Sequence, residues 1–432
     1  MKHYDKYKPS GVDWIGKLPV GWDVIRLKYK TLSLKSGGTP SSGNENFYSE
    51  DGTPWVTIAD MSNTDYVYDT EKKVTEEGIK DKSLNIYPEG TLLYSIYATL
   101  GKVSILKVPA TINQAILAIA LKKDYNQSFL KYNFKAMENY VFSLSNGNTQ
   151  YNLNAEKVAN FFIVDCPFSE QTAIADYLDA KCSKIDNVVE VQQKRIELLK
   201  ELKQSIITNA VTKGLDKNVE LKTSGIEWIG DIPEKWTVKK VSWLFQLGSG
   251  TTPKSGNKRY YVDDGGYNWL QTGDLNDSFI LETSKKISKA AIEECNLKIY
   301  PKGSMVVAMY GATIGKTGIL NIDTAVNQAC CVLKKSKDVN EMFAFYMFQA
   351  GKPSLLRDAN GGGQPNISQE IIAGKKFAIP PYKEQLKIVD YLNKKNYAID
   401  NQISKIERQI ELLKEYKQSI ITECVTGKRK VC

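Results

Sequence analysis

The amino-acid sequence repeats itself at a nearly constant offset, and this repeat limits the folds that the chain can adopt. SGVDWIGKLPVGW at residues 10–22 returns as SGIEWIGDIPEKW at residues 224–236, so Trp14 and Trp228 lie 214 positions apart. Further segments return at the same offset: IELLK at 196–200 and 410–414, KQSIIT at 203–208 and 417–422, and NQA at 113–115 and 327–329. Two copies of one structural unit therefore make up most of the 432 residues.

Each copy ends in a segment with the spacing of a coiled-coil helix. Apolar residues recur every seven positions, with Gln192 as the one polar rung, and charged residues occupy the other faces. The rungs are Leu178, Ile185, Leu199 and Ile206 in the first copy, and Leu392, Ile399, Ile406, Leu413 and Ile420 in the second. Ile174, Val188 and Leu202 are expected to form an adjacent seam in the first copy. The matching ladders favour two helices that bury each other's seams, and the alternative is that each helix lies on its own domain.

The remaining segments have short apolar runs separated by Gly, Pro, Asn and Asp, as strands and turns do. The predicted fold is α+β: two tandem α+β domains joined by two long helices that form an antiparallel coiled coil, with a pseudo-twofold internal repeat. The expected boundaries are a first domain at 1–166, a long helix at 167–211, a linker at 212–223, a second domain at 224–380, a long helix at 381–427 and a tail at 428–432. The short linker favours the antiparallel arrangement, and the chain termini are then expected to lie close together.

One segment resembles a phosphate-binding P-loop, and the duplication argues against that function. In MYGATIGKTGIL at 309–320, three residues separate Gly311 from Gly315, whereas a P-loop has four at this place. The counterpart SIYATLGKVSIL at 95–106 keeps the Ala-Thr and Gly-Lys pairs but lacks the first glycine. Both segments are predicted to be a strand, a glycine turn and a strand, with a lysine exposed near the turn.

Composition excludes most catalytic classes. His3 is the only histidine, which leaves no base for Ser-His-Asp or Cys-His catalysis and few ligands for zinc. The seven cysteines have no C-x-x-C spacing, so we expect no disulfide framework, no thiolate metal site and a cytoplasmic location. No run of 18 apolar residues and no apolar signal core occur, so no membrane association is expected. The net charge of +9 permits an anionic partner.

Two domains at opposite ends of an antiparallel helix pair match double-stranded DNA, whose strands are also antiparallel. Twofold protein symmetry mirrors half-site symmetry in DNA, and the spacing of the reading elements fixes the spacing of the half-sites. The two copies of the repeat differ most within these domains and agree most in the long helices. The sequence therefore predicts a split, asymmetric DNA target.

An ordered and duplicated set of motifs runs through the chain from about residue 8 to residue 427. The motifs are LPVGW (18–22) and IPEKW (232–236), SGGTPS (36–41) and GSGTTPKSG (248–256), the Ala-Thr-x-Gly-Lys turns, and PFSEQ (167–171) and PYKEQ (381–385) before the helices. With this set, the chain resembles the DNA specificity subunit of type I restriction–modification systems. It implies two target recognition domains, no catalysis in this chain, and double-stranded DNA as ligand. It further implies two methyltransferase subunits and restriction–translocase subunits as partners. Those partners would use S-adenosylmethionine, ATP and Mg²⁺, and this chain would hold no cofactor.

Candidate DNA-contacting residues are the polar and basic side chains near the Gly-Thr-Pro stretches, the turns and two later loops. They are Thr39, Ser41, Ser42, Asn44, Tyr97, Lys102 and Gln150 in the first copy, and Thr252, Lys254, Lys258, Arg259, Tyr310, Lys316 and Gln364 in the second. For each of them, an ordinary surface position is the alternative. A rival for the whole chain is a two-headed scaffold whose ligand is not DNA, and DNA binding would be distinguished from it by a steep dependence on salt.

Overall fold

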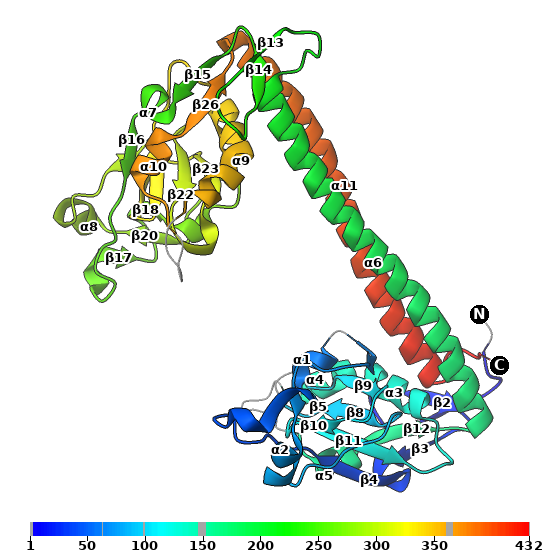
Figure 1. The fold of residues 1–432 in the computed structure, drawn as a ribbon. Coiled ribbons are helices and arrows are strands. Elements are labelled where there is room, and N and C mark those ends of the chain that lie inside the picture. Colours follow the sequence, from blue (N-terminus) through cyan, green and yellow to red (C-terminus); the bar gives the residue numbers. More distant parts are fainter. Residues whose placement is uncertain (1–2, 63, 98–99, 146–152, 360–365, 432) are drawn as a thin grey trace. The chain divides into compact units, whose positions relative to one another are not determined.

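The computed structural model describes residues 3–62, 64–97, 100–145, 153–359 and 366–431, which form two compact units. Unit 1 comprises residues 1–192 and 407–432, and unit 2 comprises residues 193–406. Each unit contains one α+β head and two helical segments, one from α6 (Phe168–Lys213) and one from α11 (Tyr382–Val425) (Figure 1). The predicted α+β class, with tandem domains and two long helices, is confirmed. Among the described residues, no helix is long and apolar enough to cross a membrane.

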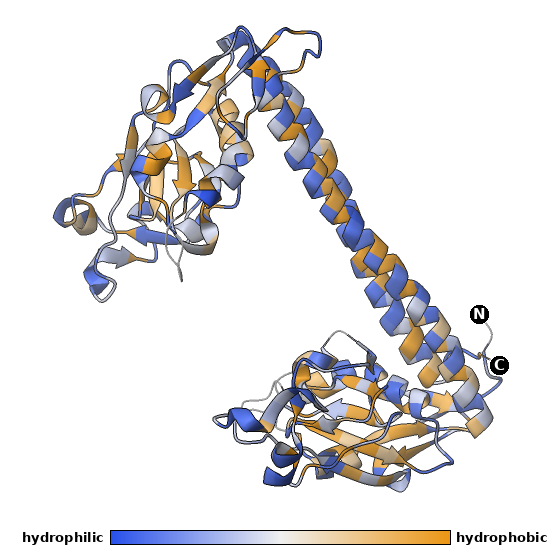
Figure 2. Cartoon of the chain, viewed as in Figure 1, coloured by the Kyte–Doolittle hydropathy of each residue, from blue (hydrophilic) through white to orange (hydrophobic). Residues whose placement is uncertain are grey.

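Head 1, the part of unit 1 before α6, is built on a five-stranded sheet. Its strand order is β4-β11-β8-β9-β6, antiparallel except for the parallel pair of β6 and β9. The strands are β4 (Thr31–Ser36), β6 (Tyr66–Val67), β8 (Leu92–Ser95), β9 (Val103–Leu106) and β11 (Ile116–Leu121). Every residue of β8 and β9 is buried, and Figure 2 shows hydrophobic residues on these central strands. Burial of both faces explains why these strands have continuous apolar runs.

Smaller elements complete head 1. A second sheet has the order β10-β5-β7, and the antiparallel pairs β12–β3 and β1–β2 lie apart from both sheets. Their bounds are β1 (Tyr7–Pro9), β2 (Lys17–Pro19), β3 (Asp23–Arg26), β5 (Tyr48–Val56), β7 (Lys73–Val74), β10 (Thr111–Ile112) and β12 (Phe162–Asp165). The helices are η1 (Leu27–Tyr29), η2 (Glu45–Phe47), α1 (Ile58–Met61), α2 (Glu76–Asp81), α3 (Gln127–Ala136), α4 (Glu138–Ser145) and α5 (Ala155–Ala159).

Head 2, the part of unit 2 between the helices, repeats this plan. Its first five-stranded sheet has the order β16-β25-β22-β23-β19, again with one parallel pair, β19 and β23. These strands are β16 (Leu247–Ser249), β19 (Ser278–Ile280), β22 (Met305–Ala308), β23 (Thr317–Leu320) and β25 (Cys330–Leu333). The strands β9 and β23 follow the two Gly-Lys turns, and each pairs with the strand before its turn. The prediction of a strand, a turn and a strand is therefore confirmed in both copies.

A second sheet of head 2 has the order β17-β20-β18-β24-β21, with the pairs β15–β26 and β13–β14 beside it. Their bounds are β13 (Leu221–Thr223), β14 (Asp231–Pro233), β15 (Thr237–Lys240), β17 (Tyr261–Val262), β18 (Tyr267–Leu270), β20 (Lys285–Ile287), β21 (Ile299–Tyr300), β24 (Thr324–Val326) and β26 (Lys376–Ile379). The helices are α7 (Val241–Leu244), η3 (Lys258–Tyr260), η4 (Thr272–Asp274), α8 (Lys289–Glu294), η5 (Gly311–Thr313), α9 (Glu341–Arg357) and α10 (Gln369–Gly374). The stretch predicted as a linker at 212–223 thus contains the end of α6 and all of β13.

The helices run antiparallel within each unit. In unit 1, Lys417 of α11 donates to Asp186 of α6 at 2.6 Å. In unit 2, Lys203 of α6 donates to Asp400 of α11 at 2.7 Å, which is the same pairing in the other copy. Of the predicted rungs, Leu178, Ile185, Leu392, Ile399, Ile406 and Ile420 are buried, and Leu199, Ile206 and Leu413 are half-buried. The predicted coiled-coil seam is therefore confirmed.

The adjacent seam predicted for α6 is wrong in two of its three positions. Ile174 is buried, but Val188 and Leu202 are 45% and 49% exposed. Steps of three and four residues alternate along a coiled-coil face, so the second buried column is offset by four residues from the first. It consists of the buried Cys182, Ile196 and Ala210 and the half-buried Val189 and Lys203.

The two ends of the chain meet in unit 1, as predicted. Tyr7 of β1 donates its hydroxyl proton to the carbonyl of Gly427 at 3.0 Å, and the ring of His3 lies 2.9 Å from the carbonyl of Lys428. These contacts seat the first strand of head 1 on the residues that follow α11.

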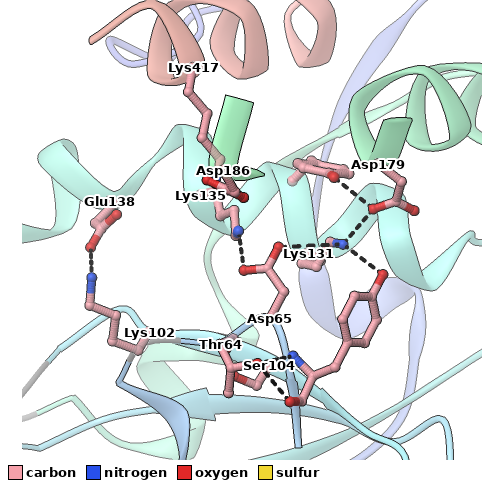
Figure 3. Close-up of polar contacts among 12 residues, drawn as sticks. Thr64, Asp65, Lys102, Ser104, Lys131, Lys135, Glu138, Asp179, Asp186 and Lys417 are labelled. Carbon is pink, nitrogen blue, oxygen red and sulfur yellow. Dashed lines mark hydrogen bonds and ion pairs between the residues drawn. The ribbon is translucent and has the colours of Figure 1, made fainter. Parts of the chain in front are cut away.

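Head 1 meets the helices through a partly buried cluster of charges, which we call the charged junction (Figure 3). It consists of Asp65, Lys131, Lys135 and Asp179. The fully buried Lys131 of α3 lies 2.7 Å from Asp179 of α6 and 3.8 Å from Asp65, and Lys135 donates to Asp65. Tyr132 also donates to Asp179, at 2.6 Å. The side chain of Gln418 in α11 donates to the carbonyl of Lys135 at 2.8 Å.

Opposite charges shift the pKa values of two groups in this junction. Burial alone would raise the pKa of Asp65, but Lys135 and Lys131 hold it below its ordinary value. Burial alone would lower the pKa of Lys131, but Asp179 and Asp65 raise it. Both groups are therefore ionised at neutral pH.

Head 2 meets the helices without these charges, through what we call the neutral junction. Ser278, Phe345, Gln349 and Asn393 occupy the equivalent places, as the strand pairing and the repeat offset define them. Two hydrogen bonds recur: Tyr346 donates to Asn393 at 2.6 Å, and Gln204 of α6 donates to the carbonyl of Gln349 at 3.1 Å. The two junctions thus share hydrogen bonds and differ in charge.

Candidate nucleic-acid interface

The strand order of head 1 brings several candidate loops to one edge of its five-stranded sheet. Strands β4 and β8 end there, and β11 begins there, because Ser36 pairs with Leu117 and Ser95 pairs with Ile116. The Gly-Thr-Pro loop, the Tyr97 turn and the loop before β11 therefore leave the sheet side by side. Loops at one edge of a rigid sheet are common carriers of binding residues.

The equivalent edge of head 2 gathers the equivalent loops. Ser249 pairs with Cys331, and Ala308 pairs with Cys330, so β16 and β22 end where β25 begins. The second Gly-Thr-Pro-like loop and the Tyr310 turn leave the sheet at this edge.

The same two hydrogen bonds hold the Gly-Thr-Pro loop in both heads. In head 1, the indole of Trp55 donates to the carbonyl of Gly38 at 3.1 Å, and the hydroxyl of Tyr48 donates to the carbonyl of Pro40 at 3.0 Å. In head 2, Trp269 donates to Thr251 at 3.4 Å, and Tyr261 donates to Pro253 at 2.7 Å. Burial raises the pKa of Tyr48 and of Tyr261, which keeps both phenols protonated as donors. We call this shared arrangement the loop frame.

A glycine at the start of each loop lets two backbone segments touch. A Cβ atom on Gly37 would collide with the carbonyl of Ile112, and a Cβ atom on Gly250 would collide with the carbonyl of Val326. Only glycine fits such a close approach. The loops therefore begin from a fixed point on the sheet.

In head 1, the loop frame uses part of the predicted set for its own structure. Thr39 donates to the side chain of Gln114, and the amide and hydroxyl of Ser41 face Asp81 at 3.3 and 3.5 Å. Asn44 caps η2 by accepting from the amide of Asn46 at 3.2 Å. Ser42 is exposed at the tip of the loop. Of these residues, Ser41 and Ser42 have exposed side chains.

In head 2, the predicted loop residues are exposed and mostly basic. Thr252, Lys254, Lys258 and Arg259 all lie on the surface. Asn257 caps η3 as Asn44 caps η2, so the side chains of Lys258 and Arg259 begin from a fixed backbone. Arg259 forms an exposed ion pair with Glu294 at 3.1 Å.

The turn residues differ between the heads. Tyr97 and Tyr310 are 38% and 46% exposed at equivalent places. Lys102 donates to Glu138 at 2.8 Å, and the residue equivalent to Glu138 in head 2 is Lys352, so Lys316 has no carboxylate there. Gln150 and Gln364 lie outside the described residues.

The structure adds residues that the sequence analysis did not name. Glu45 and Asn46 are exposed on η2 at the places that Lys258 and Arg259 occupy on η3. Lys285 and Lys286 of β20 line a hollow with Lys258. A direct alignment of the two Gly-Thr-Pro loops, instead of the offset that holds for the rest of the repeat, would have identified Glu45 and Asn46. The second pair is distant in sequence, and only the sheet topology brings it near.

Comparison with known proteins gives the family. The family described as the type I restriction modification DNA specificity domain matches residues 19–201 and 233–412. The specificity subunit of the type I restriction enzyme MjaIX from Methanocaldococcus jannaschii is 25% identical over 428 residues, which cover 96% of this chain and 95% of that protein. The specificity subunit of EcoKI from Escherichia coli is 20% identical over 453 residues, which cover 95% and 90%.

Two solved structures share the fold. One, described as showing complex assembly and conformational transition of the type I R-M system, has a TM-score of 0.72 at 16% identity and covers 94% of this chain and 98% of that one. The HsdS subunit from Thermoanaerobacter tengcongensis has a TM-score of 0.51 at 17% identity and covers 95% and 98%. The family match spans both copies, and each copy holds the same loop frame at the same sheet edge. The chain therefore belongs to the family of type I restriction–modification DNA specificity proteins.

Proposed function

We propose that this chain is the DNA-reading subunit of a type I restriction–modification complex, with one head on each half of a split target. The observation that carries the proposal is one loop frame with two sets of side chains. At equivalent places, head 1 presents Ser41 and Asn46, whereas head 2 presents Lys254 and Arg259.

These side chains suit different bases. Arg and Lys donate to the O6 and N7 acceptors of guanine, and Asn pairs with adenine. Two heads that carry such different donors and acceptors would read two different half-sites, and the complete target would be asymmetric.

The names of the relatives, which are specificity subunits of type I restriction enzymes, support the proposed partners. Two methyltransferase subunits, one for each copy of the repeat, and restriction–translocase subunits would assemble with this chain in the cytoplasm. Methylation would use S-adenosylmethionine and translocation would use ATP and Mg²⁺, all of them bound by the partners. This chain would contribute the choice of sequence and no catalytic group.

The alternative is a two-headed scaffold for a ligand other than DNA. Binding to duplex DNA that weakens steeply as salt rises supports the DNA reading, because displaced counterions are the source of that dependence. Binding that salt does not change supports the scaffold.

Genome-wide mapping of methylated adenines tests the proposal. We expect cells that contain this gene and its partners to methylate one bipartite, asymmetric motif, and cells without the gene to lose that motif alone. Retention of every methylated motif, in cells that produce active partner subunits, would contradict the proposed role.

A further inference from the structure

Head 2 has a basic hollow beside its Gly-Thr-Pro-like loop. Its volume is about 670 Å³, which is large enough for a nucleotide-sized group. Lys258 of η3 and Lys285 and Lys286 of β20 line it, together with the hydroxyl-bearing Ser255 and Ser284. Asp263 is the one acidic residue in its lining.

The three lysines are not engaged by carboxylates. None of them forms an ion pair with any other residue that the structure describes. The nearby Arg259 and Lys289 have acidic partners, Glu294 and Glu293. Three unpaired ammonium groups around a concave surface favour the binding of an anion, and the hydroxyls in the lining are able to donate hydrogen bonds to it.

The equivalent surface of head 1 has a different charge. Lys73 pairs with Pro54 of β5, and Lys286 pairs with Asn268 of β18, which is the equivalent of Pro54 in the repeat. Lys73 is therefore the equivalent of Lys286, and Lys72 corresponds to Lys285. Lys258 is replaced by Glu45, and Ser284 by Glu71. Lys73 lies 3.5 Å from Asp69, within an ion pair. Head 1 therefore has two of the three lysines, with carboxylates among them.

We propose that Lys258, Lys285 and Lys286 form a phosphate-binding cleft, which holds the DNA backbone next to the bases that head 2 reads. This inference rests on the proposed function, since the phosphate belongs to the target DNA. Head 2 then supplies more of the sequence-independent, salt-dependent affinity than head 1. Head 1 contributes to the choice of sequence and binds the DNA backbone more weakly.

The test compares matched pairs of lysines in the full chain with its modification subunits. The variants K285A/K286A and K72A/K73A remove the same two strand lysines from head 2 and from head 1. Affinity for a duplex of random sequence is measured across a salt series. Because each phosphate contact contributes about 0.9 to the slope of log affinity against log salt, K285A/K286A is expected to lower that slope by about 2 and K72A/K73A by less than about 1.

A gain of function sharpens the comparison. E45K supplies head 1 with the third lysine of head 2, and we expect it to increase the salt slope, whereas K258A is expected to reduce it. Equal effects of the two double variants, or an effect on the specific target alone, would overturn the inference. Saturable binding of inorganic phosphate that K285A/K286A abolishes, with DNA binding unchanged, would assign the hollow to a free anion and also overturn it. A wild-type complex without salt-dependent DNA binding would instead contradict the proposed function.

Discussion

The two junctions between heads and helices use the same hydrogen bonds but differ in charge. In each unit, a tyrosine of the head donates to the long helix that follows that head, to Asp179 of α6 in unit 1 and to Asn393 of α11 in unit 2. In each unit, a glutamine of the other long helix donates to a backbone carbonyl of the head, in α3 or in α9. The charged junction adds Lys131, Lys135 and Asp65, whereas the neutral junction has uncharged side chains there. The recurrent bonds are therefore common to both junctions, and the charges are a separate property of head 1.

The two junctions are expected to tolerate different substitutions and pH values. A buried lysine is stable only while its carboxylates remain, because an uncompensated buried charge costs several kcal/mol. Phe345, which is 6% exposed, fills the equivalent place by apolar packing alone. Head 1 should therefore respond to changes of charge and pH that leave head 2 unaffected.

The largest effect is expected from a charge in the neutral junction. Phe345→Lys would bury an ammonium group beside Asn393, with no carboxylate in the equivalent place, and should destabilise head 2 by about 4 kcal/mol. Hydrogen exchange of α9 amides measures this loss. The double variant F345K/N393D restores the pair of head 1 and should recover part of the stability, whereas a loss below about 1 kcal/mol would show that charge does not distinguish the junctions.

The reverse exchange in head 1 should have a smaller effect. Asp179→Asn keeps an oxygen acceptor for Tyr132 and Lys131 but removes the negative charge, while Asp65 remains 3.8 Å from Lys131. We expect a destabilisation of about 2 kcal/mol, measured by hydrogen exchange of α3 amides. K131F/D179N reproduces the pair of head 2 and should be more stable than D179N alone. No recovery in the double variant would contradict the pairing of these two residues.

A fall in pH is expected to produce the smallest difference in stability between the two heads. The pKa of Asp65 in the folded chain lies below the ordinary value of 3.8, so its ionised form stabilises head 1 above that pH. This stabilisation is lost as the pH falls through the lowered pKa. We expect amide protection in α3 to decrease in this range before that in α9. Asp65→Asn should remove the difference between the heads, and an unchanged difference in this variant would assign it to another group.

The repeat explains why the sequence predicted so much of the fold. Each motif occurs twice, so an interpretation had to suit both copies. This requirement identified the paired helices, and it identified the segments around Gly101 and Gly315 as a strand, a turn and a strand. The heptad ladder located Ile185 and Ile399 in the seam. It placed Val188 and Leu202 wrongly, because a single column of residues does not determine the side on which the second column lies.

The candidate site was less predictable because it depends on contacts between distant residues. Thr39 was expected at the DNA surface, but its hydroxyl donates to Gln114, more than 70 positions later. Lys285 and Lys286 lie beside Lys258 only because β17 and β18 both pair with β20. Sequence patterns gave the residue types that suit DNA, and the sheet determined which of them share a surface.

The central claim is that the two heads read DNA separately, and one exchange of side chains tests it most directly. The variant K254S/R259N gives the loop of head 2 the side chains of Ser41 and Asn46 on the same loop frame, and it leaves Lys258 in place as a phosphate contact. Methylated adenines are then mapped in cells that contain the variant and active partner subunits. We predict that one half of the bipartite motif changes, while the other half and the spacer stay as they were. A motif that is unchanged, or altered in both halves, would contradict separate reading by the two heads.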